Sequence, residues 1–228
     1  FEIRGEAAAI GAARQMAREA KQRQIQLIVT HTRRGHWYGG LAARLAGVPV
    51  VMYYHDLSHS RLSRLTKVLL ALNATRVIAI SNAVKQDLAA VPVVGKWVGR
   101  KVAVIPNAVN LELFHPAVDG RKVITEFGLD TAFPIIGLVG QMSEWKGQLD
   151  LIKAAHTVAR AFPAMKLLLI GDSILDNADY EKRLRELINT LGLDDKVIFT
   201  GHRNDIPECM AALDILVSAS WAEPFGLV

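Results

Sequence analysis

Residues 135–147 have the sequence IIGLVGQMSEWKG, an apolar run that passes into a polar loop and then into a helical pattern. The run at 135–139 is continuous rather than alternating, which is typical of a strand buried on both faces of a parallel sheet. The helical pattern that follows has apolar side chains at spacings of four, three and four, at Leu151, Ala155, Val158 and Phe162. A buried strand, a loop and an amphipathic helix in this order predict one unit of an α/β fold.

The same unit recurs along the chain. Seven other apolar runs have the length of a strand, at 25–29, 48–53, 77–80, 102–105, 167–170, 197–199 and 215–217. Helical patterns lie between many of them, including a segment rich in Ala, Arg and Glu at 8–20 and a segment that carries Leu184, Leu187, Ile188 and Leu191 before Gly192. The alternation predicts parallel sheets whose strands are joined by right-handed crossovers.

One stretch interrupts the alternation. Residues 107–133 show no long periodic pattern and are bounded or broken by Pro106, Pro116, Gly120, Gly128 and Pro134. We therefore predict a first α/β domain at 1–107, a linker at 108–132 and a second α/β domain at 133–228. Each domain has about four predicted strands, which is few for a doubly wound sheet, so we expect both to be incomplete.

Composition narrows the class of protein. The chain has 228 residues, 51% of them hydrophobic and 21% charged, which excludes a disordered chain or a collagen-like repeat. Its one cysteine, Cys209, allows no internal disulfide or multi-cysteine zinc site and suits a reducing cytoplasm. No apolar run approaches the length of a membrane span. The net charge of +5 favours an anionic partner, whether nucleic acid, lipid or a phosphorylated small molecule.

The loop before the second-domain helix predicts a phosphate site. Lys146 lies there at the carboxyl edge of the predicted sheet, where open α/β sheets bind ligands, and close to the amides that begin a helix. The usual nucleotide fingerprints, G-x-G-x-x-G and the Walker A loop, are absent from the sequence. The alternative is that Lys146 is an ordinary surface lysine.

Two further loops end at the same edge. Residues 199–205, FTGHRND, contain a glycine that permits close approach of a ligand, and residues 218–228, SASWAEPFGLV, contain a carboxylate suited to sugar hydroxyls. Each loop also has a simpler interpretation. Residues 199–205 would then be an ordinary turn with Asp205 near a helix start, and Glu223 would be a surface glutamate. Because parallel strands bring all three loops to one edge, together they favour a binding site.

The ordered set of motifs resembles glycosyltransferase family 4. It comprises VIPNAVNLELF at 104–114, Lys146-Gly147, Gly171-Asp172, Phe199 with Gly201, and EPFG at 223–226; RVIAIS at 76–81 and LAARLAGVPV at 41–50 also fit. The resemblance covers nearly the whole sequence. It implies the GT-B fold, two Rossmann-like α/β domains facing each other across a cleft. It also implies transfer of a sugar from a nucleotide-sugar donor, with retention at the anomeric carbon and no required metal or other cofactor.

The resemblance also implies roles for individual residues. Lys146 would hold the donor diphosphate, Glu223 would contact the donor sugar, and His55 would lie near the reacting sugar. Arg203 and Asp205 lie where the family contacts the nucleotide base. Backbone amides for the sugar or phosphate would come from Phe225, Gly226 and Leu227.

Two positions depart from the family pattern. Gln141 stands where the family commonly has arginine, so it would bind the donor by hydrogen bonds without a charge. Ala108 follows Asn107 where the family often has glycine, which would stiffen the hinge. The family's second glutamate would fall at position 231, so we expect residues 1–228 alone to be inactive.

Several alternatives stay open at this stage. On a similar fold the protein would be a nucleotide-sugar epimerase or a phosphorylase, and without catalysis it would be a two-lobed sugar- or nucleotide-binding protein. His55 and His59 are spaced as metal ligands but lie in a predicted loop, so we expect no metal. Cys209 lies among apolar residues and is not expected to be a nucleophile. The sequence lacks the interleaved aromatic and basic residues that would support nucleic-acid binding.

The acceptor is expected to be a glycan or a lipid-linked molecule. Residues 61–72, RLSRLTKVLLAL, predict a helix whose Leu62, Leu65, Leu69 and Leu72 share a face, with Arg61, Arg64 and Lys67 toward its first half. Such a helix can lie on an anionic membrane surface, or its apolar face can pack on the sheet. We expect a cytoplasmic protein, with peripheral attachment to the inner membrane face as one possibility.

Overall fold

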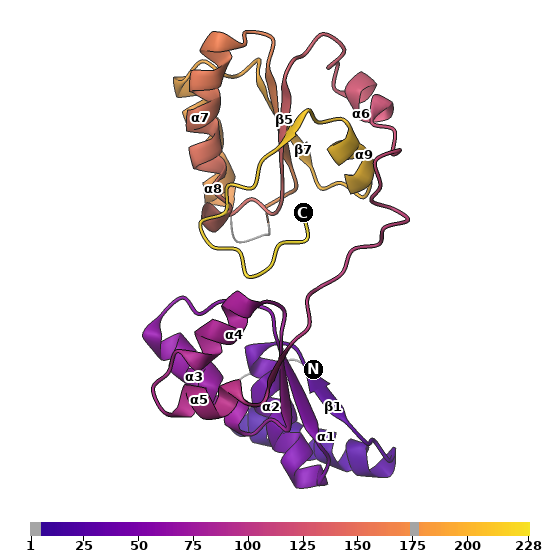
Figure 1. Ribbon diagram of the computed structural model, residues 1–228, viewed down its shortest axis with the longest axis vertical. Helices are drawn as coiled ribbons and strands as arrows, with labels where there is room; N and C mark the ends of the chain where they lie inside the picture. The colour runs from indigo at the N-terminus through magenta and orange to yellow at the C-terminus, as the bar shows by residue number, and fades with distance from the viewer. Residues whose placement is uncertain (1–5, 174–177) are drawn as a thin grey trace. The chain divides into compact units, whose positions relative to one another are not determined.

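The computed structural model describes residues 6–173 and 178–228, which form two compact units. The first unit comprises the residues up to Ala108 together with Glu223–Leu227, and the second comprises Val109–Ala222 with Val228. Each unit contains one four-stranded sheet, and every described strand pairs with its neighbours in parallel (Figure 1). The fold is therefore α/β with two Rossmann-like sheets, and each of the eight apolar runs overlaps a strand.

The first unit has a sheet in the order β1-β2-β3-β4. Its elements are α1 (Glu6–Gln22), β1 (Ile28–Thr30), α2 (Arg33–Ala46), β2 (Val50–Tyr54), α3 (Arg61–Leu72), β3 (Arg76–Ala79), α4 (Asn82–Ala89), α5 (Val94–Gly99) and β4 (Val102–Val104). Three helices begin at a hydroxyl residue, Thr32, Ser60 or Ser81, whose side chain accepts a hydrogen bond from the third amide beyond it.

The first sheet is buried mainly on one face. Along β2, Val50, Met52 and Tyr54 are buried whereas Val51 and Tyr53 are only half-buried. The buried face packs on α3, α4 and α5 through Val68, Ala71, Val84, Leu88 and Val98. The prediction of burial on both faces is therefore wrong for this sheet, because the described helices leave its second face partly open. Tyr53 lies on that second face.

Helix α3 has the predicted bounds, but its leucine face does not pack on the sheet. It is held in the first unit by Lys67, Val68 and Ala71. The predicted leucine face is exposed instead, by 73% at Leu62, 40% at Leu65, 49% at Leu69 and 42% at Leu72. The alternative in which these leucines pack on the sheet is wrong. The basic cluster also differs, because Lys67 is buried and Arg64 pairs with Asp87 at 2.8 Å.

The second unit has a sheet in the order β7-β6-β5-β8. Its elements are α6 (Arg121–Glu126), β5 (Ile135–Val139), the 3₁₀ turn η1 (Glu144–Lys146), α7 (Gln148–Ala161), β6 (Lys166–Ile170), α8 (Ala178–Thr190), β7 (Val197–Gly201), α9 (Ile206–Ala211) and β8 (Ile215–Leu216). Helix α6 lies within the stretch expected as linker, 108–132. It is part of this unit because Val123 and Leu129 are buried in the unit's core.

Helices cover both faces of the second sheet. Figure 1 shows α7 and α8 on one side of the strands and α6 and α9 on the other. Along β6, Leu167 and Leu169 pack with α7 and α8, whereas Leu168 and Ile170 pack with α6 and α9. The continuous apolar sequences of β5 and β6 therefore reflect burial on both faces, as predicted. At the edge, β8 is exposed.

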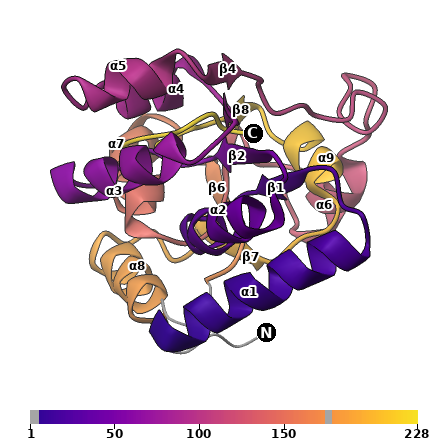
Figure 2. The ribbon, with the colours of Figure 1, turned by 90° about the horizontal axis from the view of Figure 1, so that it is seen from below.

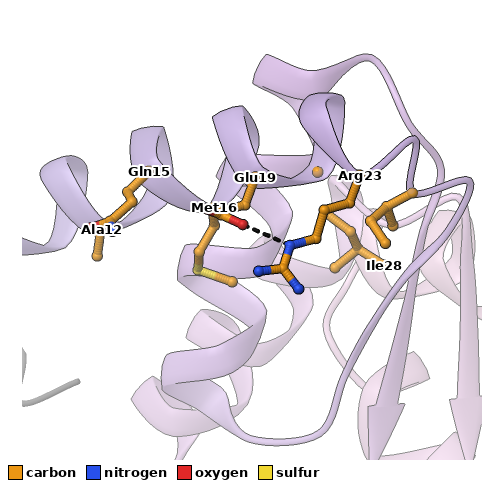
Figure 3. Close-up of a pocket in the computed structure, with 8 residues that line it drawn as sticks. Ala12, Gln15, Met16, Glu19, Arg23 and Ile28 are labelled. Carbon is orange, nitrogen blue, oxygen red and sulfur yellow. Dashed lines mark hydrogen bonds and ion pairs between the residues drawn. The ribbon is translucent and has the colours of Figure 1, made fainter.

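A cavity of about 500 Å³ lies beside α1, which packs against α2 (Figures 2 and 3). Its walls are mostly apolar, with Ala12, Met16, Ile25 and Ile28 among the lining residues. Two of its polar lining residues, Glu19 and Arg23, form an ion pair with each other at 2.8 Å. None of the predicted site residues lines this cavity.

Replacing Leu167 by alanine is expected to lower the free energy of unfolding of the second unit by about 2–5 kcal/mol, because the side chain is fully buried in the central layer of the sheet. The measurement is urea unfolding followed by circular dichroism. Leu111→Ala is the matched control, because Leu111 is 73% exposed and its loss should change stability by about 0.5 kcal/mol at most. Equal losses for the two variants would contradict this description of the core.

Candidate functional site

The loop that carries Lys146 is fixed by backbone and side-chain contacts. After β5, the amide of Met142 donates to the carbonyl of Asp172 at 3.0 Å, which joins this loop to the one after β6. The Gln148 side chain donates to the carbonyl of Gln141 at 2.9 Å. Tyr180 on α8 in turn donates to Gln148 at 3.1 Å, so the loop is anchored to two helices. Gln141 thus contributes its carbonyl to the loop's own structure.

Two glycines let neighbouring loops approach each other closely. Gly147 ends η1 at φ +74°, and a Cβ there would overlap the carbonyl oxygen of Ala219 after β8. Gly171, at φ +137°, would likewise overlap the carbonyl oxygen of Gly140. Any other residue at these positions would push the loops apart. The loops after β5, β6 and β8 therefore form one interlocked rim at the carboxyl edge of the second sheet.

Trp221 fastens the loop after β8 to this rim. Its amide donates to the carbonyl of Trp145 at 2.9 Å, and its indole nitrogen donates to Asp150 on α7 at 2.8 Å. Residues 218–222 are consequently held beside the Lys146 loop. The motif that begins with Glu223 follows directly.

Lys146 is half-buried at this rim. Its ammonium lies 4.2 Å from the centroid of the Trp145 ring, which is a favourable distance for a cation–π contact. Its aliphatic stem passes close to Gly140, where a Cβ would lie 3.6 Å from Cδ and Cε of the lysine. The side chain is thus directed by the loop, which is what a group that binds phosphate requires.

Arg203 and Asp205 form an ion-pair fork within the second unit. The Arg203 guanidinium donates to both carboxyl oxygens of Asp205 at 2.7 and 2.8 Å and to those of Glu126 at 2.6 and 2.9 Å. The hydrogen bonds to Glu126 and then Asp205 raise the pKa of Arg203, and the hydrogen bond from Arg203 lowers the pKa of each carboxyl. Arg203 thus joins α6 to the loop before α9. Its contact with a nucleotide base, and that of Asp205, stay predictions.

The Glu223 motif forms a tight turn. Gly226 has φ +77°, and a Cβ there would lie 3.2 Å from Cγ of Glu223. Glu223 and Gly226 are therefore close neighbours on the two sides of the turn. The roles expected of Glu223, Phe225, Gly226 and Leu227 toward a donor sugar stay predictions.

In the first unit, His55 belongs to a cluster of three stacked rings. Its ring centroid lies 4.6 Å from that of Tyr53 and 5.4 Å from that of His31, with interplanar angles of 17° and 26°. Nε2 of His55 lies 3.1 Å from Nδ1 of His31. Burial lowers the pKa of His55, the neighbouring His31 lowers it further, and Asp56 partly opposes the change.

The segment after His55 is anchored by a buried carboxylate. Asp87 on α4 accepts hydrogen bonds from the amide and the hydroxyl of Ser58 at 3.1 and 2.6 Å and from Arg64 at 2.8 Å. The buried Lys67 donates to the carbonyl of Asp56 at 2.6 Å, and burial lowers its pKa. Helices α3 and α4 thus fix the loop that carries His55.

His36 is a core residue rather than a ligand-binding one. It is buried, its Nδ1 lies 2.7 Å from the Thr30 hydroxyl, and its ring lies 4.3 Å from that of Tyr54. Burial, followed by the nearby His31, His55 and Lys67, lowers its pKa to about 4. The ring is therefore neutral at physiological pH.

The remaining candidates have no site around them in the described residues. Cys209 is fully buried and its thiol pKa is raised by burial, which disfavours the thiolate that a nucleophile needs. His59 is exposed. No three metal-ligating side chains come together in the part of the chain that the structure describes. Metal-free chemistry stays a prediction.

No role was predicted from the sequence for His31, Tyr53 or Asp87, and Trp221 was included only as part of the loop at 218–228. A signal existed for His31, since it follows the strand β1 directly, as His55 follows β2. Tyr53 lies within an apolar run, so the sequence pattern did not distinguish it from a core residue. Asp87 and Trp221 act through contacts with residues that are distant in sequence, which no local pattern indicates.

Comparisons with known proteins agree with this geometry. Residues 3–113 match the family model "Glycosyltransferase Family 4", and residues 121–228 match the model "Glycosyl transferases group 1". The chain belongs to the GT-B glycosyltransferases of the family 4 type. The two models meet close to the boundary between the two compact units.

Individual members of the family are similar over most of the chain. The Escherichia coli UDP-Gal:alpha-D-GlcNAc-diphosphoundecaprenol alpha-1,3-galactosyltransferase is 28% identical over 223 residues, which cover 91% of this chain and 55% of that protein. The alpha-maltose-1-phosphate synthase of Mycolicibacterium smegmatis is 27% identical and covers 84% of this chain and 54% of its own length. The chain thus spans about half the length of these relatives.

Solved structures of the family give the same result. Anabaena Alr3699/HepE in complex with UDP-glucose is 31% identical, with a TM-score of 0.81, over 94% of this chain and 58% of that one. A glycosyltransferase from Rickettsia africae is 25% identical, with a TM-score of 0.83, over all of this chain and 60% of that one.

Replacing Arg203 by alanine is expected to lower the free energy of unfolding by about 1–3 kcal/mol at pH 7, because the fork joins α6 to α9. The loss should shrink as pH falls. Asp205 and Glu126 have lowered pKa values in the folded state, so their contribution is present above their ordinary pKa values and disappears as they are protonated. Thermal unfolding of wild type and variant between pH 3 and pH 8 measures this. Lys182→Ala, on the exposed surface of α8, is the control. A pH-independent difference would contradict the ion-pair assignment.

Proposed function

We propose that this chain takes part in the transfer of a sugar from a nucleotide-sugar donor, with retention of anomeric configuration, to a glycan or lipid-linked acceptor. The observation that carries the proposal is the interlocked rim at the carboxyl edge of the second sheet, with Lys146 held in it. Lys146 would bind the donor diphosphate, and Glu223 with the amides of Phe225, Gly226 and Leu227 would bind the donor sugar.

The chemistry of the rim suits this role. When a glycosidic bond to a diphosphate breaks, negative charge grows on the departing oxygen. A fixed ammonium stabilises that charge more in the transition state than in the ground state, and it can do so without a metal ion. Because Gln141 is uncharged, the positive charge within residues 140–147 comes from Lys146.

A UDP-linked sugar is the donor to examine first. The Anabaena protein, similar over 94% of this chain, was solved with UDP-glucose. The name of the Escherichia coli relative specifies UDP-Gal and an acceptor linked to diphosphoundecaprenol. We extend both to this chain as proposals, since it covers a little over half of either protein.

We further propose that the first unit rests on an anionic membrane surface through α3 and α5, in the cytoplasm. The four exposed leucines of α3 form a stripe, and α5, which packs against α3, adds Trp97 at 64% and the preceding Val93 at 72% exposure. An exposed apolar stripe with a tryptophan suits the interface of a bilayer. None of the described helices is long and apolar enough to cross a membrane.

The charge of the first unit favours an anionic surface. Residues 1–108, which make up most of the first unit, contain sixteen lysines and arginines and five acidic residues. Residues 111–228 contain eleven basic and seventeen acidic residues, so the net positive charge of the chain lies in its first half. Arg61, Lys96 and Arg100 lie exposed on α3 or at the end of α5, where they would meet lipid phosphates.

The Lys146→Ala variant of the complete gene product is expected to bind UDP and UDP-sugars about ten- to a hundredfold more weakly, because one charge-assisted hydrogen bond is worth about 1.5–3 kcal/mol. Isothermal titration calorimetry and kcat/KM measure the effect. Lys182→Ala on α8 should leave both unchanged. Equal affinity of the Lys146 variant and wild type would show that the rim does not bind the diphosphate.

The Leu62→Gln/Leu69→Gln double variant is expected to lose binding to phosphatidylglycerol vesicles by about tenfold, since each exposed leucine would bury apolar surface in the bilayer. Co-sedimentation measures this at low and high salt. Leu111→Gln/Leu113→Gln, at two exposed leucines outside the first unit, is the matched control. No binding of wild type at low salt, or equal binding to phosphatidylcholine vesicles, would overturn the membrane proposal.

A further inference from the structure

The two histidines at the carboxyl edge of the first sheet form an imidazole pair. The register pairs Thr30 on β1 with Met52 on β2, so His31, the next residue, lies alongside Tyr53. Tyr53 and His55 share a face because they are two residues apart. Nδ1 of His31 and Nε2 of His55 are therefore brought to hydrogen-bond distance, 3.1 Å, by the pairing of the strands themselves.

Tyr53 holds both rings in place. Its centroid lies 4.6 Å from that of His55 and 5.4 Å from that of His31, and both rings are nearly parallel to it. Its hydroxyl donates to the carbonyl of Ile105, just after β4, at 3.3 Å. The ring orientation of His55 is thus set by contacts to three strands in addition to the anchored loop that carries it.

Proton counting determines what such a pair can do. A hydrogen bond between two imidazole nitrogens needs one N–H and one lone pair, so the two rings cannot both be charged while it exists. In the neutral pair, the nitrogen of His55 that faces His31 is Nε2 in either arrangement. Nδ1 is then the nitrogen left for a ligand, and its protonation is dictated by which ring donates.

We propose that His31 is a positioning residue that occupies Nε2 of His55, leaves Nδ1 to face the sugar, ties the tautomer of His55 to its own and disfavours a charged His55 ring. The relevance to transfer rests on the proposed function, in which His55 lies near the reacting sugar. An uncharged ring there would exchange hydrogen bonds with sugar hydroxyls without repelling the positive charge that develops at the anomeric carbon.

The surrounding groups support an uncharged ring. Burial lowers the pKa of His55, and the neighbouring His31 adds to this, whereas Asp56 opposes it. The other titratable groups around the pair are Tyr53 on β2, His36 on α2 and Lys67 on α3. His36 is neutral at physiological pH, so it adds no charge to the cluster.

The direct test is ¹⁵N NMR of histidine-labelled complete gene product, which reports tautomer and titration without substrate. In wild type, the tautomer of His55 should be complementary to that of His31. In His31→Phe, which keeps a ring but removes the hydrogen bond, the tautomer populations of His55 should change and His55 should titrate at higher pH. His31→Asn places an amide, which can donate or accept, near the position of Nδ1 and should keep the titration of His55 close to that of wild type. Identical spectra and titration of His55 in wild type and His31→Phe would overturn the proposal.

Steady-state kinetics of sugar transfer provide a second test of the proposal. His31→Phe should lower kcat about tenfold with the KM for the donor changed less than about twofold, and the acidic limb of kcat should move to higher pH. His31→Asn should stay within about threefold of wild type, and His59→Gln, at an exposed histidine outside the pair, should match wild type. Changed NMR spectra with unchanged kcat would overturn the positioning role. If wild type transfers no sugar, the proposed function fails, and the NMR arm still decides the pairing.

Discussion

The two sheets are parallel throughout their described strands, and the location of each candidate group depends on this pairing. Parallel pairing sends each strand's carboxyl end to the same edge of its sheet. In the second unit, this brings the loops after β5, β6 and β8 into contact, where Gly147 and Gly171 allow backbone to lie directly on backbone. In the first unit, it brings His31 beside His55. Neither arrangement needs long-range contacts beyond the sheets and the helices that cover them.

Much of the fold was predictable because buried parallel strands have a distinctive composition. Runs such as 135–139 and 167–170 are apolar without alternation, and they form the central strands of the second sheet. The same pattern was misleading for β2, where Tyr53 occupies a half-buried face and contributes to the histidine cluster. An apolar run indicates a strand, but it does not reveal how many of its faces are covered.

The site was predictable only as far as its local motifs. Lys146 lies in the loop after β5 at the carboxyl edge of the sheet, as its sequence context predicts, and Glu223 follows a segment anchored by Trp221. The ion-pair fork of Arg203 could not be anticipated, since Glu126 lies 77 residues earlier in the chain. The exposed leucines of α3 show the same limit. Helical periodicity correctly predicted that the four leucines share one face of α3. It did not predict that the opposite face, with Val68, Ala71 and the hydrogen-bonded Lys67, is the buried one.

The position of Lys146 over the Trp145 ring has an optical consequence. Indole emission depends on charges close to the ring, and here an ammonium lies 4.2 Å from its centroid. An anion that draws the ammonium away would change the field at the indole and therefore its fluorescence. If Lys146 binds a diphosphate as proposed, the fluorescence of Trp145 would change on binding and would report occupancy without an attached dye.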